Sequence, residues 1–311
     1  MPEISQSNPI FLHLYQDKVL SIQPDPFTCS ILDEKSVPIW QLVAVRFNDL
    51  EGTWHSADCG KILDRTDNSV SFLVSSQTSP VKLQGKCLQE EETLFLEFIS
   101  EPQNSASWMC LNFRAEPDEH FLGLGERFDQ LDQRGNQVVL KVINGATGGR
   151  TYKPIPFFIS SKGYGVQLLN SAQSVLRLAA PDDSRTTSIR TQTSAMKVRL
   201  FSEGTSKDIL TAYTSFCGRQ ELPPPWVFGP WKSRDWTTEN QQTAEEDIVM
   251  GRYHHLAGTV KLIDAAWETY NQCFTFDEKR WPDPDALIHK IHQLGYKLIL
   301  WISPWLFKYD E

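Results

Sequence analysis

The sequence predicts a multidomain β plus α/β fold, in which an N-terminal β-sandwich is followed by a parallel strand-helix region. Three features of the 311 residues support this fold class. Short runs that alternate apolar and polar residues fill the first two thirds of the chain, a proline triplet follows at 223–225, and apolar runs then alternate with amphipathic segments over 226–311. The length suits about two domains, and we predict one at 1–222 and the other at 223–311.

Residues 1–222 contain short runs with the period of two that is typical of strands with one buried face. Asn, Asp, Gly, Pro and Ser residues bound these runs, as expected for turns. Many short strands at such spacing predict a β-sandwich. The clearest runs are 19–23, 40–47, 70–74, 93–99 and 196–201.

The region from residue 226 onward predicts three strands and two helices. The segment 237–255 is polar, with apolar residues at helical spacing. The segment 281–295 has a helix start at Pro282 and Asp283, an apolar stripe, and a stop at Gly295. Strands separated by helices of this length predict a parallel sheet. The three strand-like runs are 226–231, 259–264 and 297–303.

Three parallel strands are too few for a complete sheet, because parallel strands are usually buried on both faces and need neighbouring strands. A closed eight-stranded barrel takes about 250 residues, and an open doubly wound sheet usually has at least about five strands. The sequence therefore predicts a truncated sheet, and the pattern alone leaves both architectures open.

The composition is that of an ordinary globular protein, with 40% hydrophobic residues, 22% charged residues and a net charge of -9. The acidic balance disfavours nucleic acid as a partner. No apolar stretch approaches the roughly 18 residues of a membrane span, and residues 1–10 lack the features of a secretion signal. We therefore expect no membrane partner and a cytoplasmic location, and the sequence leaves the oligomeric state open.

The cysteines and histidines show no metal-ligand spacing. His289 and His292 lie three residues apart without a third ligand, and no pair of cysteines has C-x-x-C spacing. We predict no metal and no cofactor, and we expect buried free thiols in place of disulfides. The six cysteines are Cys29, Cys59, Cys87, Cys110, Cys217 and Cys273.

Eight motifs follow one another along the chain. The first four are Phe-Leu-Gly-Leu-Gly-Glu-Arg-Phe at 121–128, Pro-Phe-Phe-Ile-Ser-Ser-Lys-Gly-Tyr-Gly-Val at 156–166, Leu-Pro-Pro-Pro-Trp at 222–226 and Trp-Lys-Ser-Arg at 231–234. The next four are Phe-Thr-Phe-Asp at 274–277, Trp-Pro-Asp-Pro at 281–284, Leu-Gly-Tyr-Lys at 294–297 and Leu-Trp-Ile-Ser-Pro at 300–304. Each motif alone is weak evidence for any family, but in this order the motifs resemble the N-terminal region and early barrel of glycoside hydrolase family 31.

The resemblance implies a galactose-mutarotase-like β-sandwich followed by a (β/α)8 TIM barrel, of which this chain holds the first three βα units. It also implies a retaining α-glycosidase that hydrolyses α-glucosides or related α-glycosides, with carbohydrate as the partner. Such an enzyme needs two carboxyl groups about 5 Å apart, which the family carries as Asp residues after the fourth and sixth barrel strands. By that count both lie beyond residue 311, so the isolated chain is expected to be inactive. The alternative is a non-catalytic sandwich module that binds carbohydrate.

The resemblance also implies substrate contacts at the carboxyl ends of the barrel strands. Asp264 follows the second strand and matches a family Asp that hydrogen-bonds sugar hydroxyls. The alternative for Asp264 is a helix N-cap or a turn. Arg234 follows the first strand and would pair with a pocket carboxylate, or it is a solvated or structural residue.

Tryptophans near the strand ends are the other candidates for sugar contacts, because an indole ring packs well on the C–H faces of a sugar. The alternative for each of them is the barrel core, and Trp301 is our first choice for a pocket wall. The family further implies that the loop 144–152 reaches over the barrel mouth. The candidate tryptophans are Trp231, Trp236, Trp267, Trp301 and Trp305.

Overall fold

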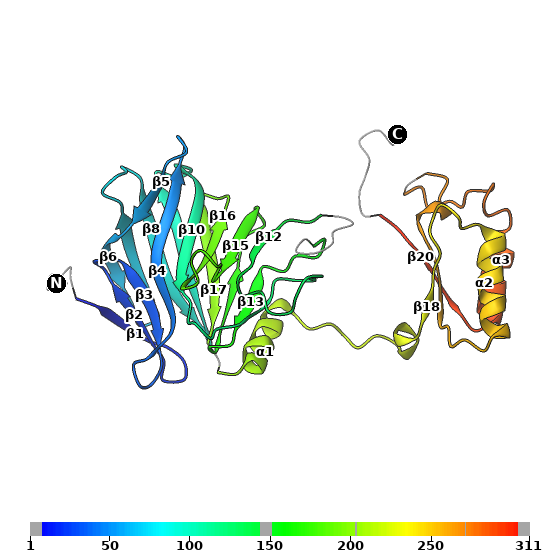
Figure 1. Ribbon diagram of the computed structural model, residues 1–311, viewed down its shortest axis with the longest axis horizontal. Coiled ribbons are helices and arrows are strands. Elements are labelled where there is room, and N and C mark those ends of the chain that lie inside the picture. The colour runs from blue at the N-terminus through cyan, green and yellow to red at the C-terminus, as the bar shows by residue number, and fades with distance from the viewer. Residues whose placement is uncertain (1–7, 144–150, 203, 271, 304–311) are drawn as a thin grey trace. The chain divides into compact units, whose positions relative to one another are not determined.

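The computed structural model describes residues 8–143, 151–202, 204–270 and 272–303. The chain divides into two compact units, Met1–Arg219 and Gln220–Glu311. Figure 1 shows the strands of the first unit in blue to green and the smaller second unit in yellow to red. We describe each unit by itself.

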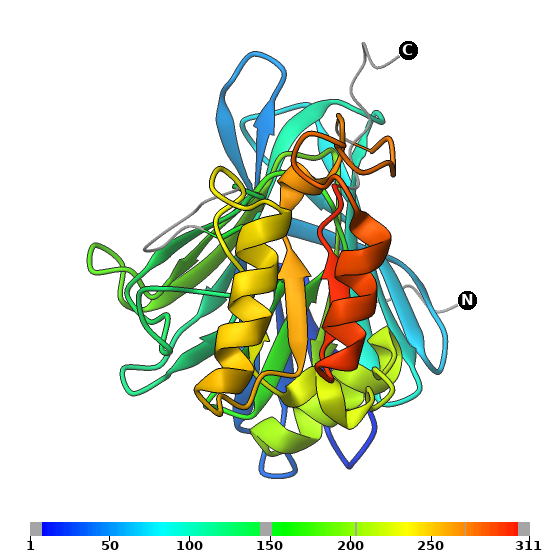
Figure 2. The ribbon, with the colours of Figure 1, turned by 90° about the vertical axis from the view of Figure 1, so that its right-hand side faces the viewer.

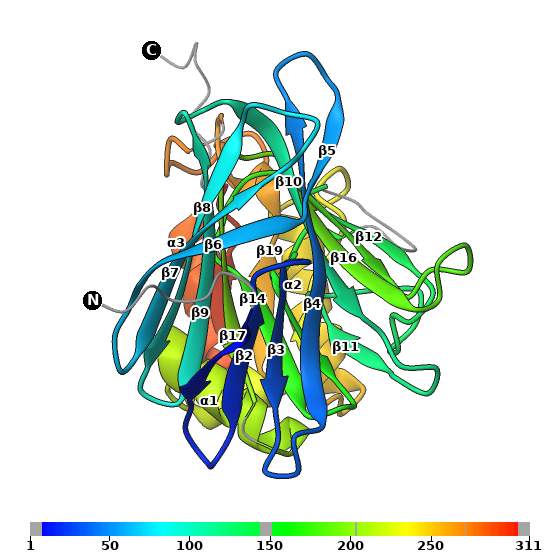
Figure 3. The ribbon, with the colours of Figure 1, turned by 90° about the vertical axis from the view of Figure 1, so that its left-hand side faces the viewer.

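Within the described residues, the first unit contains two antiparallel sheets, which confirms the predicted β-sandwich (Figures 1 and 3). The nine-stranded sheet has the order β1-β2-β3-β4-β10-β16-β15-β12, with β5 beside β4, and the eight-stranded sheet has the order β11-β13-β14-β17-β9-β8-β7-β6. The strands of the nine-stranded sheet are β1 (Ile10–His13), β2 (Val19–Gln23), β3 (Thr28–Leu32), β4 (Pro38–Asp49), β5 (Trp54–Ala57), β10 (Ala106–Arg114), β12 (Gln137–Leu140), β15 (Ser174–Leu178) and β16 (Thr186–Thr191). The strands of the eight-stranded sheet are β6 (Cys59–Arg65), β7 (Ser69–Ser75), β8 (Lys82–Glu90), β9 (Thr93–Glu101), β11 (Phe121–Gly123), β13 (Phe157–Ser160), β14 (Tyr164–Leu168) and β17 (Ala195–Phe201).

The sandwich core follows from the alternation in the sequence. In β7, Val70, Phe72 and Val74 are buried while Ser71 and Leu73 between them are half-exposed, as a strand with one face on the core requires. The Phe72 ring lies 4.9 Å from the ring of Phe27, which precedes β3, and 5.9 Å from that of Phe98 in β9. These aromatic contacts join residues from both sheets and stabilise the core between them.

A helix, α1 (Ser206–Cys217), covers part of the outer face of the eight-stranded sheet. It starts at a capping box in which the Thr205 side chain and Asp208 satisfy each other's backbone N–H groups. Its Ile209 is buried against Phe157 and Phe201, and its Tyr213 ring stacks on Phe157 at 3.8 Å. This helix therefore belongs to the sandwich unit.

Among its described residues, the second unit contains three parallel strands, β18 (Trp231–Lys232), β19 (Val260–Ile263) and β20 (Lys297–Leu300), in that order. The helices α2 (Gln241–Tyr253) and α3 (Pro284–Gln293) lie side by side on the same face of this sheet (Figures 1 and 2). Ala244 and Ile248 of α2 and Leu287 and Ile291 of α3 share a buried core with Ile263. This is the predicted start of a barrel, with strands and helices alternating along the chain.

Several element boundaries of the second unit differ from the predictions. Residues 225–228 form a 3-10 helix (Pro225–Phe228) and not a strand, because Pro225 at its first turn fixes a helical φ. The first strand is therefore only Trp231–Lys232, and the third ends at Leu300. The helix predicted at 237–255 starts later, at Gln241, where Asn240 supplies the N-cap.

Other predictions concern the cysteines and the membrane. All six cysteines are free thiols, and Cys29, Cys87 and Cys110 are buried as expected, whereas Cys217 is exposed. Among the described residues, no helix is both long enough and apolar enough to cross a bilayer.

Candidate functional site

The candidate site lies at the carboxyl ends of the three parallel strands of the second unit. Val260 of β19 pairs with Trp231 on one side and with Lys297 on the other. Because all three strands run in the same direction, the residues that follow them meet at one edge of the sheet, where such folds place their binding residues. Asp264 follows β19 and Trp301 follows β20 at this edge.

Asp264 uses one carboxylate oxygen in the structure. Its Oδ1 accepts a hydrogen bond from the backbone N–H of Ala265 at 2.7 Å and so caps the short 3-10 helix Ala265–Trp267. Within the described chain no hydrogen bond involves Oδ2. The N-cap alternative and the sugar-contact prediction are thus compatible, because the second oxygen remains able to accept from a hydroxyl.

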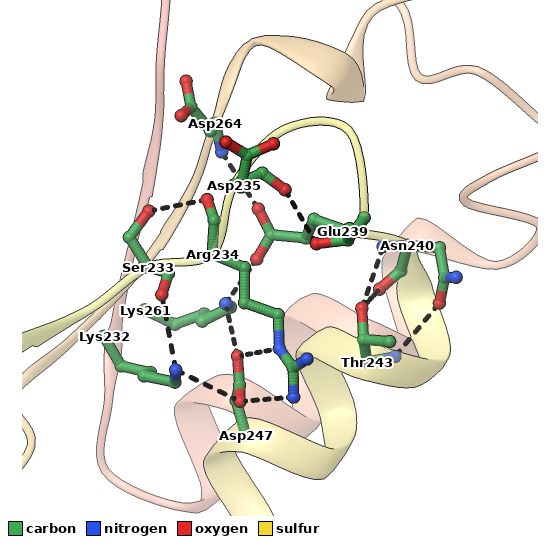
Figure 4. Close-up of polar contacts among 11 residues, drawn as sticks. Lys232, Ser233, Arg234, Asp235, Glu239, Asn240, Thr243, Asp247, Lys261 and Asp264 are labelled. Atoms are coloured by element: carbon green, nitrogen blue, oxygen red, sulfur yellow. Dashed lines mark hydrogen bonds and ion pairs between the residues drawn. The ribbon is translucent and has the colours of Figure 1, made fainter.

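A buried lysine holds the backbone beneath Asp264. Lys261, in the middle of β19, has no exposed side-chain surface, and its Nζ donates to Glu239 Oε1 at 2.5 Å and to Asp247 Oδ2 at 3.1 Å. The other carboxylate oxygen of Glu239 accepts the Asp264 backbone N–H at 3.2 Å. Figure 4 shows Glu239 between Lys261 and Asp264, so that one carboxylate joins the buried cation to the candidate sugar contact.

Arg234 completes this ion network from the segment after β18. Its Nε and Nη2 donate to the two oxygens of Asp247, each at 2.9 Å, in a two-pronged geometry (Figure 4). Lys232 Nζ lies 3.5 Å from Asp247 Oδ1. Burial raises the pKa of Asp247, but the hydrogen bonds from Arg234 and Lys261 outweigh it and hold this pKa below its usual range. Arg234 therefore has a carboxylate partner within this unit.

The predicted tryptophans divide between core and surface. Trp267 is only 3% exposed, packs on Phe276 with ring centroids 5.1 Å apart, and donates its Nε1–H to the backbone carbonyl of Trp301 at 2.7 Å. Trp301 is 36% exposed and donates its backbone N–H to the carbonyl of Ile263. The structure thus brings Asp264, Trp267 and Trp301 together, and Trp301 is the one with an indole available to a ligand.

Trp231 lies away from Asp264, whereas Trp236 lies in the loop that follows β18. Trp231 pairs with Val260 at the amino end of β19, so the length of that strand separates it from Asp264. Trp231 is 44% exposed, and its Nε1–H donates to the carbonyl of Val227 at 3.0 Å. Trp236 is 52% exposed in the loop before α2, where its carbonyl accepts from Arg280. Trp305 and residues 144–150 of the predicted loop lie outside the described residues.

Glu239, Asp247 and Lys261 are site residues that the sequence analysis did not identify. The available signal was Lys261, a charged residue inside the apolar run 259–264, because a buried charge needs a partner. Asp247 gave a second signal, since it shares the buried helix face of Ala244, Ile248 and Gly251. Among the residues that the structure describes, no group of three or more potential metal ligands occurs.

Two family models match the chain. The model of the glycosyl hydrolase 31 N-terminal galactose mutarotase-like domain matches residues 9–176. The model of the glycosyl hydrolases family 31 TIM-barrel domain matches residues 220–311, the range that contains the three parallel strands and Asp264.

Several curated relatives are named as α-glycosidases. The chain is 29% identical over 269 residues to alpha-xylosidase XylQ of Lactiplantibacillus pentosus, covering 85% of this chain and 34% of the relative. It is 31% identical over 194 residues to an alpha-xylosidase of Emericella nidulans, covering 60% and 24%. It is 27% identical over 191 residues to an alpha-glucosidase of Saccharolobus solfataricus, covering 58% and 27%. The chain thus spans about a third or less of the length of these relatives.

Solved structures share the fold at low sequence identity. A GH31 dextranase of Flavobacterium johnsoniae, solved with isomaltotriose, aligns with a TM-score of 0.57 and 18% identity over 94% of this chain and 37% of its own. A GH31 family sulfoquinovosidase from E. rectale aligns with a TM-score of 0.64 and 14% identity over 97% and 48%.

Proposed function

The chain belongs to glycoside hydrolase family 31, and from this membership we propose that it is the N-terminal part of a retaining α-glycosidase. The observation that carries the proposal is the edge of the parallel sheet, where Asp264 and Trp301 follow the neighbouring strands β19 and β20. Asp264 keeps one carboxylate oxygen without a hydrogen bond among the described residues, and Trp301 is 36% exposed. A carboxylate accepts hydrogen bonds from sugar hydroxyls, and an indole packs against the apolar face of a sugar ring. In the proposal, Asp264 and Trp301 form one wall of the sugar site.

The ion network positions Asp264 in this proposal. Glu239 accepts the Asp264 N–H and is held by Lys261, which is in turn bound to Asp247 and thereby to Arg234. Because these groups pair with one another in a buried setting, the backbone at Asp264 is fixed before substrate arrives. Preorganisation of this kind lowers the cost of ordering a site upon binding.

The pairing within this network is a reason to expect that Glu239 and Asp247 are not the two catalytic carboxylates. A retaining mechanism needs one carboxylate as nucleophile and a second as acid and base, about 5 Å apart. Glu239 and Asp247 are buried, and each is bound to a cation, so neither offers a free oxygen to the anomeric carbon. We therefore propose that the 311-residue chain alone does not hydrolyse glycosides and that the nucleophile and acid/base follow later barrel strands.

The proposed substrates are α-glycosides of glucose or xylose. The support is the set of relatives, whose names include two alpha-xylosidases and an alpha-glucosidase. The two sugars differ by one hydroxymethyl group, so discrimination depends on whether the complete pocket has room and hydrogen-bond partners for it.

The test uses the complete enzyme with Asp264→Ala. We expect kcat/KM for 4-nitrophenyl α-xyloside and α-glucoside to fall about tenfold or more, because the hydroxyl contacts are lost. Asp285→Ala is the matched control, since it removes an exposed carboxylate from α3 of the same unit. Equal kcat/KM values for Asp264→Ala and the parent enzyme would place Asp264 in a structural role only.

The second part of the test measures glycoside hydrolysis by the 311-residue chain itself. We expect no hydrolysis of either glycoside above that of a blank with heat-denatured chain. Turnover by the purified chain would contradict the proposed origin of the catalytic carboxylates.

A further inference from the structure

The outer face of the nine-stranded sheet carries a row of cationic and polar side chains. Across β4, β10, β16 and β15 the register aligns Arg46, Cys110, Arg190 and Val175, while the neighbouring residues Val45, Leu111 and Ile189 point into the core. The next row on the same face joins Asn112, Ser188, Arg177 and Gln137. Figure 3 shows β4, β10 and β16 next to one another, with β12 beyond them.

These two rows line a cavity of about 370 Å³. Its lining includes the small residues Cys110, Ala180 and Ser188 and the longer side chains Arg46, Trp54 and Arg190. Its volume lies within the range of about 300–1,000 Å³ that is typical of small-molecule sites.

Two of the guanidinium groups lie against aromatic rings and, within the described part of the chain, have no other partner. Arg46 lies 5.6 Å from the centre of the Trp54 ring, and Arg190 lies 5.2 Å from that of Trp108. Across the described residues neither guanidinium has a hydrogen bond or an ion pair. A cation–π contact uses the face of the guanidinium and leaves its N–H groups able to donate. The two strands that carry them are about 10 Å apart, a span suited to a sugar unit.

The register places Arg46 and Arg190 on the two strands that flank Cys110. Burial raises the pKa of the Cys110 thiol to about 11, and the charges of Arg46, Arg190 and Arg177 act in the opposite direction, so all three cations lie near this sulfur. The opposing charges are Asp183, which also lines the cavity, and Asp182, which pairs with Arg177. The lining therefore keeps an excess of positive charge in a chain whose net charge is -9.

We propose that this cavity binds a saccharide that carries an anionic group, either the carboxylate of a uronic acid or a phosphate ester. Guanidinium groups bind both anions in a two-pronged geometry. Asn112, Gln137 and Ser188 supply donors and acceptors for hydroxyls, and Trp54 offers an aromatic surface. Nucleic acid fits less well, because it requires an extended basic surface. The site uses no residue of the second unit and goes beyond the proposed glycosidase function.

The test is a calorimetric titration of the 311-residue chain at low salt with four probes: trigalacturonic acid, glucose 6-phosphate, maltotriose and inorganic phosphate. We expect at least one of the two charged sugars to bind about tenfold or more tightly than both maltotriose and inorganic phosphate. Comparison of the two charged sugars distinguishes a carboxylate from a phosphate ligand. Added salt should weaken the binding, because the contact is ionic.

The variants Arg46→Gln and Arg190→Gln should each weaken binding of the charged sugar about tenfold. Arg65→Gln, which removes an exposed arginine from β6 in the other sheet, is the matched control and should leave affinity unchanged. Circular dichroism and the thermal midpoint of each variant verify that the sandwich is folded. The absence of saturable binding by either charged sugar, equally tight binding of inorganic phosphate, or full affinity in a folded Arg190→Gln chain would overturn the proposal.

Discussion

At the residue scale, Lys261 is the side chain on which the polar interior of the second unit depends. It is fully buried in a strand and neutralised by Glu239 and Asp247. Asp247 has further cationic partners in Arg234 and Lys232, whereas the only cation paired with Glu239 in the described chain is Lys261. Removal of Lys261 therefore leaves one buried carboxylate without its counter-charge.

We predict that Lys261→Met destabilises the second unit by about 3–5 kcal/mol, the cost of leaving a buried charge unpaired. The measurement is urea unfolding of the chain, followed by tryptophan fluorescence. A second substitution, Glu239→Gln, should recover part of the loss because it removes the unpaired charge. Lys279→Met removes an exposed lysine of the same unit and serves as the control. Unchanged stability of Lys261→Met would show that the network contributes little.

The candidate site was only partly predictable from individual residues. The family resemblance singled out Asp264, and the prediction that it contacts sugar still stands untested. Glu239 was missed because its role depends on a lysine 22 positions later, a pairing that arises only when the loop before α2 packs against β19. Trp267 and Trp301 both lie shortly after a strand of the parallel sheet. The sequence could not predict that Trp267 is buried and Trp301 half-exposed, because this difference depends on packing.

At the scale of the elements, the contact between β7 and β8 depends on a glycine. Gly85 of β8 lies directly opposite Phe72 of β7. A Cβ atom at residue 85 would lie 1.9 Å from the Phe72 ring, so the ring occupies the space that any other residue would need. The Phe72 ring in turn contacts Phe27 and Phe98 in the centre of the sandwich.

We predict that Gly85→Ala destabilises the sandwich by about 1–3 kcal/mol, because the Phe72 ring must move within a close-packed core. The thermal midpoint of the chain would measure the effect. Gln84→Ala, at the exposed neighbouring position of the same strand, should change that midpoint little. Equal midpoints for Gly85→Ala and the parent chain would mean that the core accommodates the extra methyl group.

The elements were predictable where local pattern alone determines them. The run 19–23 is β2, and Asp283 is the N-cap of α3, as expected. The strand predicted at 226–231 was wrong for residues 226–230, because apolar character outweighed the proline signal in the interpretation. The order of strands within the two sheets was not predicted, since it depends on pairings between residues far apart in the sequence.

At the scale of the whole molecule, the two units are joined by an exposed segment. Residues 218–224 form neither helix nor strand, and Leu222 within them is strongly exposed. Such segments between compact units are the usual sites of proteolytic cleavage. Glu221 provides a protease site in the middle of this segment.

We predict that a Glu-specific protease, used briefly at low concentration, cuts the folded chain first after Glu221. Mass spectrometry should then detect the fragments 1–221 and 222–311. Glu221→Gln removes this site and should delay the appearance of both fragments. First cleavage within the strands of the sandwich would contradict the arrangement of two units joined by an open segment.

The ion network of the second unit also bears on how the chain folds during synthesis. Its hydrogen bonds join residues that are 13 to 25 positions apart, whereas Arg199 of the sandwich bonds to Thr93, 106 positions earlier. Because the ribosome synthesises the chain from the N-terminus, the two sheets of the sandwich cannot be completed until their last strands have been translated. The ion network around Lys261 can form soon after residue 264 leaves the ribosome. The first part of the barrel would therefore acquire its polar interior while later segments are still being translated.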